Sequence, residues 1–70
     1  MNKERDDFLA ELAKNLADEA TAIEGYYKLI TLCPEKYIPH IVEIIADEKN
    51  HMEVLRGIME DIDKIKPNKN

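Results

Sequence analysis

The sequence predicts an all-α protein: a hairpin of two long antiparallel helices that pairs with a second copy of itself to form a four-helix bundle. The chain has 70 residues, 44% hydrophobic and 36% charged, with only two glycines and three prolines, which is typical of ordered helices. Apolar residues recur at helical spacing in two long stretches, and prolines interrupt the chain between them. The apolar face of each stretch is wider than one neighbouring helix can cover.

The first helix is expected from about residue 5 to residue 32. Its inward positions alternate steps of three and four residues without a break, which is the heptad pattern of packed helices. We call this row of positions a seam. The first seam contains one polar residue, Glu19, and consists of Leu9, Leu12, Leu16, Glu19, Ile23, Tyr26 and Ile30.

A turn is expected over residues 33–38, because Pro34 and Pro39 would both interrupt a helix interior. Proline is tolerated in the first turn of a helix, so the second helix is expected to begin at about residue 39, or slightly earlier. Residues 34–38 can form a short helical turn of their own. The second helix should end at about residue 66, before Pro67.

The second helix carries a seam of its own, with the same alternation of three and four residues. Two of its members, Glu48 and His51, are polar. The full seam is Tyr37, Ile41, Ile44, Glu48, His51, Leu55, Ile58, Ile62 and Ile65.

A second apolar stripe accompanies each seam. A two-helix hairpin offers each helix only one neighbour, so these stripes need a further partner. A homodimer of hairpins is the simplest completion, with residues 1–70 forming one domain per chain. The stripes are Ala13, Ala20 and Tyr27 in the first helix, and Ile38, Ile45, Met52 and Met59 in the second.

The three polar seam residues are expected at one height along the bundle, which we call the polar layer. Placing Glu19 opposite the stretch from Glu48 to His51 puts the turn near residue 34, where the prolines independently place it. A buried carboxylate without a partner costs several kcal/mol, and the seams contain no lysine or arginine at this height.

In a dimer this layer would hold four carboxylates and two imidazoles, and two divalent ions would neutralise it. Carboxylate oxygens with one imidazole per ion suit iron or manganese, and zinc would also bind. The alternative is a metal-free polar layer that fixes register and oligomeric state.

Two short motifs resemble those of a known group of proteins. Residues 19–26, Glu-Ala-Thr-Ala-Ile-Glu-Gly-Tyr, resemble the E-x-x-A-x-x-x-Y stretch in the first helix of bacterioferritins and rubrerythrins. Residues 47–51, Asp-Glu-Lys-Asn-His, resemble their D-E-x-x-H. The likeness covers most of residues 9–62. A chain with one helix pair looks most like the encapsulated ferritins, whose two-helix chains build an iron site at a dimer interface.

The resemblance implies a ferritin-like fold with two iron ions per dimer. Glu19 and Glu48 would be carboxylate ligands and catalytic residues, and His51 the imidazole ligand. Asp47 matches an acid that orients a ligand histidine, here that of the other chain, and Tyr26 matches a tyrosine near the metal site.

The implied activity is that of a ferroxidase, which oxidises Fe²⁺ with dioxygen or peroxide for iron storage or detoxification. The alternatives are rubrerythrin-like peroxide reduction and a non-catalytic, metal-stabilised assembly module. Members of the encapsulated group form rings inside a protein shell, but the polar residues 65–70 do not resemble a shell-targeting tail.

Charge and hydropathy limit the other partners. A net charge of −5 argues against nucleic acid, and no apolar run approaches the roughly 20 residues of a membrane span. A lone cysteine, Cys33, and a charged start without an apolar signal core predict a cytoplasmic protein.

Overall fold

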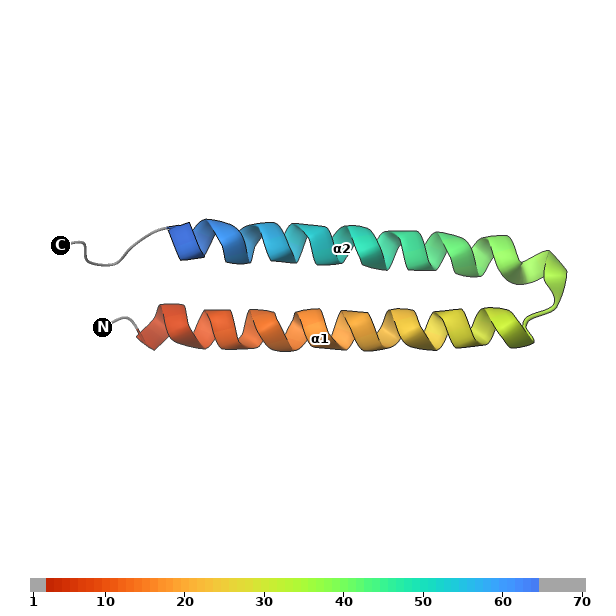
Figure 1. Cartoon of the computed structure of the whole chain (residues 1–70), viewed down its shortest axis with the longest axis horizontal. Coiled ribbons are helices and arrows are strands. Elements are labelled where there is room, and N and C mark those ends of the chain that lie inside the picture. Colours follow the sequence, from red (N-terminus) through yellow and green to blue (C-terminus); the bar gives the residue numbers. More distant parts are fainter. Residues whose placement is uncertain (1–2, 65–70) are drawn as a thin grey trace.

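The computed structural model describes residues 3–64 and shows two helices joined by a short turn. Helix α1 spans Lys3–Leu32, the 3₁₀ turn η1 spans Glu35–Tyr37, and helix α2 spans Ile38–Lys64. The two helices run antiparallel and side by side (Figure 1). The described range contains no strand, so the predicted all-α class is confirmed. The predicted end of the second helix near residue 66, with the seam residue Ile65, lies outside the described range.

The turn is closed by backbone hydrogen bonds on either side of Pro34. The Cys33 N–H donates to the Ile30 carbonyl at 3.3 Å, and the Tyr37 N–H donates to the Pro34 carbonyl at 3.0 Å. Helix α2 begins one residue before Pro39. This proline therefore lies in the first turn, where the missing N–H removes no intrahelical hydrogen bond.

The contact between the helices confirms the seam of α1 and corrects that of α2. The α1 seam positions are buried or half-buried, as predicted. In α2, the predicted second stripe of Ile38, Ile45, Met52 and Met59 faces α1 together with Ile41, Glu48, Leu55 and Ile62. The seam members that are left exposed instead are Tyr37, Ile44, His51 and Ile58. Because the apolar arc of α2 is three positions wide, spacing alone does not determine which two positions make the contact.

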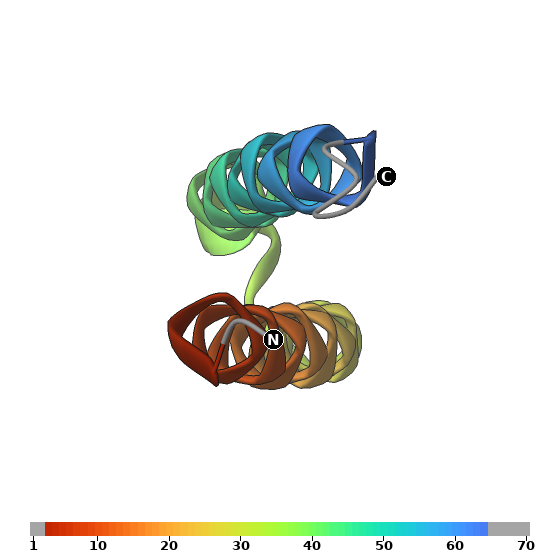
Figure 2. The same cartoon turned by 90° about the vertical axis from the view of Figure 1, so that its left-hand side faces the viewer.

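The hairpin has very little interior. Its Cα atoms extend over 58 × 15 × 12 Å, and each helix has a single neighbour (Figure 2). Among the residues that the structure describes, only Leu12, Ile23 and Ile45 are buried. A hydrophobic core of this size is marginal for a chain of this length, which favours a further stabilising element such as a metal or a partner chain.

One side of the hairpin, which we call the front face, carries most of the exposed large apolar side chains. On the opposite side, a contact joins the two helices: the Lys49 ammonium of α2 lies 5.5 Å from the centre of the Tyr27 ring of α1. We call that side the back face. Tyr27 and Lys49 flank the helix contact on the back. The heptad positions that flank this contact on its other side, on both helices, therefore lie together on the front face. These positions include Phe8 and Leu29 of α1, Tyr37 of η1, and Ile44 and Ile58 of α2, all of them exposed.

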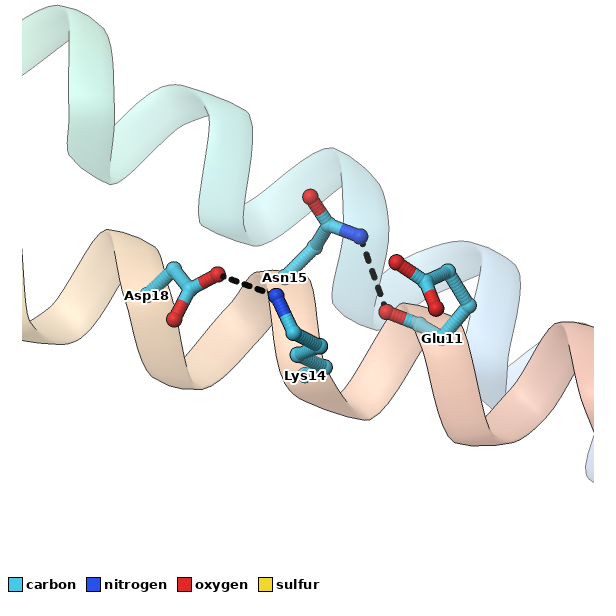
Figure 3. A network of polar contacts seen from close by, with 4 residues as sticks. All are labelled: Glu11, Lys14, Asn15 and Asp18. Atoms are coloured by element: carbon cyan, nitrogen blue, oxygen red, sulfur yellow. Dashed lines mark hydrogen bonds and ion pairs between the residues drawn. The ribbon is translucent and has the colours of Figure 1, made fainter.

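Local polar contacts lie on the exposed surface of α1 (Figure 3). Lys14 and Asp18 form an ion pair at 3.2 Å, and the hydrogen bond from Lys14 to Asp18 raises the pKa of the lysine. The Asn15 side-chain amide donates to the Glu11 carbonyl at 2.8 Å. Exposed pairs of this kind contribute little to stability, because solvent screens their charges. Neither helix of the described range is long and apolar enough to cross a membrane.

Candidate metal centre

Glu19, Glu48 and His51 meet near the middle of the hairpin. One potential ligand atom from each residue lies within 4.8 Å of the other two. Glu19 comes from α1 and the other two from α2, so the structure assembles the polar layer that the seams predict. Within residues 3–64, this is the one group of three or more acidic, histidine or cysteine side chains close enough to share an ion.

The helical spacing of α2 brings two of the three side chains to the same side. Residues three apart are neighbours on a helix surface, and His51 Nδ1 lies 3.6 Å from Glu48 Oε1. The Glu48 side chain is only 21% exposed and points between the helices, whereas the His51 side chain is 59% exposed. His51 belongs to the exposed row of α2, so the cluster opens on the front face.

The two carboxyl groups of the cluster lie close enough to compete for a proton. A hydrogen bond with the Glu48 side chain is the largest of the effects that raise the pKa of Glu19 above its ordinary value of 4.5. Desolvation and the charge of Glu48 raise it further, while His51 acts in the opposite direction. In addition, Glu48 Oε1 is buried and has no hydrogen-bond partner among residues 3–64. A cation between these groups would neutralise the two carboxylates and give the Glu48 oxygen a partner.

The spacing of the three side chains fits a metal ion. If three atoms lie within 4.8 Å of one another, some point lies at most about 2.8 Å from all three, against roughly 2.0–2.6 Å for metal–ligand bonds. Small side-chain rotations would close this difference. Two carboxylates and one imidazole suit iron, manganese or zinc.

The two predicted supporting residues do not contact the cluster through polar bonds within one chain. Tyr26 is half-buried in the α1 seam, and Asp47 is exposed one turn before His51 on α2. Neither side chain has a hydrogen-bond or ion-pair partner within residues 3–64. Any contact of Asp47 with a ligand histidine would therefore involve the His51 of a partner chain, and the roles of Asp47 and Tyr26 stay predictions.

One neighbour of the cluster was not anticipated from the sequence. Lys49 follows the ligand candidate Glu48 directly, yet its ammonium lies over the Tyr27 ring on the back face. A cation near two carboxylates could have neutralised them, but this one is directed away from them by the helix geometry. The only signal in the sequence was the place of Tyr27 in the second stripe of α1.

No protein-family model, curated protein or solved structure matches this chain. The case for a metal centre therefore depends on the geometry of the three side chains, and the likeness to ferritin-like proteins stays a prediction.

Proposed function

We propose that two copies of this hairpin form a ferritin-like four-helix bundle that holds two iron ions and oxidises Fe²⁺ with dioxygen or peroxide. The observation that carries the proposal is the position of the Glu19, Glu48 and His51 cluster. It opens on the front face, which carries more of the exposed large apolar side chains of the described residues than the back face does.

The front face supports pairing with a second copy. Ile44 on α2 and Tyr37 at the end of η1 lie on one side of His51 along the hairpin, while Ile58 lies on the other side. The cluster is thus flanked in both directions by exposed apolar side chains. A twofold axis through the polar layer would bury these side chains against each other and bring the two clusters together. Burial of apolar area at about 25 cal/mol per Å² would drive the association.

The charges of the dimer support two divalent ions. Four carboxylates carry a charge of −4 when ionised, and two divalent ions balance it. In each chain Glu19, Glu48 and His51 would hold the iron, which supplies the one-electron redox chemistry. The anionic oxygens of Glu19 and Glu48 stabilise Fe³⁺ more than Fe²⁺, because the attraction grows with the charge of the ion. The neutral imidazole of His51 adds a nitrogen ligand without adding charge.

The proposed reaction balances without an additional reductant. Two Fe²⁺ ions bind as substrates and each loses one electron. Dioxygen accepts these two electrons and two protons and leaves as hydrogen peroxide; if peroxide is the oxidant, it accepts two electrons and two protons and leaves as two water molecules. The physiological outcome would be iron storage or detoxification.

The test is anaerobic titration of the metal-free protein with Fe²⁺, followed by exposure to oxygen. We expect one Fe²⁺ per chain, then oxygen consumption with a lasting yellow-brown ferric absorbance. Glu48→Ala should abolish both results because it removes a ligand, whereas Glu53→Ala, an exposed position on the same helix, should leave both unchanged. Two ions per dimer retained by Glu48→Ala would overturn the assignment.

A second candidate is a metal-stabilised assembly module without redox activity. The small core favours this function. An ion that binds only the native state would add stability, which a core of three buried residues provides only in small measure. Tight binding that raises the melting temperature without oxygen consumption would identify this function. A faster reaction with peroxide than with dioxygen would favour the peroxide-reducing alternative.

A further inference from the structure

We infer that each hairpin binds its own divalent ion before it pairs, so that the loaded chain, rather than the metal-free chain, is the species that dimerises. This inference rests on the proposed metal site. It adds to that proposal an assignment of all three protein ligands of each ion to one chain, and an order of assembly.

The three candidate ligands of an ion come from a single hairpin. A site shared between chains would leave the ligand set incomplete within one hairpin. Here the candidate ligand atoms of Glu19, Glu48 and His51 already lie within 4.8 Å of one another in a single chain. Three protein ligands with solvent in the remaining positions make a sufficient metal site, as in catalytic zinc centres. Pairing is therefore not needed to bring the ligands together.

The cluster is accessible from the front face. The His51 side chain is 59% exposed on the front face, so an ion can reach the cluster from solvent without separating the helices. The back face at this height carries the Lys49 ammonium, which repels cations. Pairing through the front face would cover His51 and close this route. Loading before pairing thus avoids opening a formed interface.

The charge of the cluster opposes the pairing of two metal-free hairpins. A metal-free front face presents two carboxylates, and pairing two such faces would place four of them in one desolvated layer. A hairpin that holds a divalent ion presents a nearly neutral cluster, and its apolar surroundings can then be buried at lower electrostatic cost. By linkage, an ion that strengthens pairing must also bind more tightly to the dimer.

The experiment compares two lysine substitutions on α2. Ile58→Lys adds a charge to the front face, one heptad from His51, while Val42→Lys adds the same charge at an exposed position on the back face. Ile58→Lys should weaken dimerisation by at least about 100-fold, because the interface would bury an unpaired charge. Val42→Lys should dimerise like the wild type.

Both variants are titrated with Co²⁺ and followed by calorimetry, visible absorption and sedimentation velocity. We expect one Co²⁺ per chain in both, with the Ile58→Lys protein remaining a monomer. In the wild type at a protein concentration near its dissociation constant, Co²⁺ should increase the dimer fraction. Native mass spectrometry of the diluted wild type gives a second measurement, in which the monomer should carry one Co²⁺.

The outcomes separate this inference from the proposed function. A monomeric Ile58→Lys variant that binds no Co²⁺, or wild-type spectra with only metal-free monomers and doubly loaded dimers, would overturn the inference and leave the dimeric site intact. A wild type that binds no ion in any state would refute the proposed function itself. One Co²⁺ per monomer together with no Fe²⁺ oxidation would retain the inference and remove the ferroxidase activity.

Discussion

The front and back faces of the hairpin are built from the same two helices but differ in what they leave uncovered. The back face combines small side chains, Ala13 and Ala20, with Val42 and Tyr27, which stay about half exposed although the Lys49 ammonium lies near the tyrosine ring. The front face has large side chains in register on both helices and, at their centre, the exposed His51. The two faces thus differ in the number of exposed large apolar side chains and in the presence of His51, and both differences favour the front face as the one proposed to pair with a second copy.

Two adjacent isoleucines allow the strongest test of this comparison. Ile45 is 5% exposed and packs against α1, while Ile44 is 38% exposed on the front face. Ile45→Ala should lower the free energy of unfolding by about 2–4 kcal/mol at every protein concentration, because it removes core contacts of the hairpin itself. Ile44→Ala should cost less than about 1 kcal/mol in the monomer and should act mainly on dimerisation.

Urea unfolding at several protein concentrations distinguishes the two effects. For Ile44→Ala the loss of stability should grow as the wild type becomes more dimeric. Equal losses for the two variants at all concentrations would show that the front face is not an interface.

The polar layer is expected to reduce the stability of the metal-free protein, since it interrupts otherwise apolar seams. Glu48→Leu would extend the apolar contact between the helices and remove a buried oxygen that has no hydrogen-bond partner. We expect the metal-free variant to be more stable than wild type by about 1–2 kcal/mol, measured by urea unfolding in a chelator, and to bind no metal.

A different result would favour the structural alternative for this layer. If the three polar residues serve only to fix register, Glu48→Leu should change the oligomeric state or yield a mixture of states. Sedimentation velocity of the metal-free variant gives this information. An unchanged dimer that no longer binds metal supports a layer retained for function.

Heptad spacing was sufficient to predict the two helices, the turn and the polar layer, because helical geometry fixes which positions share a height and a side. It was not sufficient to orient α2. Ile44 and Ile45 are equally apolar, and only packing against α1 selects Ile45 for the contact. For the same reason the sequence placed His51 in the hairpin contact, whereas the structure places it at the front edge. The position of the Lys49 ammonium could not be predicted from the sequence either, because it depends on the Tyr27 ring of the other helix.

The smallest expected effect is on the pH dependence of the free energy of unfolding, which should reverse its direction when the metal binds. In the metal-free protein, the pKa of Glu19 is raised, chiefly by its hydrogen bond with Glu48. The native state therefore binds this proton more tightly than the unfolded state. The resulting stabilisation is fully present below the ordinary pKa of 4.5 and is lost as the pH rises through the raised value. Unfolding of the wild type and of Glu19→Gln across this window, in a chelator, should show the contribution in the wild type alone.

In the metal-loaded protein the free energy of unfolding should change with pH in the opposite direction. A bound ion requires both carboxylates to be ionised, so protons compete with the metal and stability should fall as the pH is lowered. Glu24→Gln, at an exposed position of α1, is the matched control for the loss of a charge. It should leave the pH dependence of stability unchanged, both with and without metal. If the free energy of unfolding changes with pH in the same direction with and without metal, the proton and the ion do not compete for one site. The front face would then bind no cation between Glu19 and Glu48.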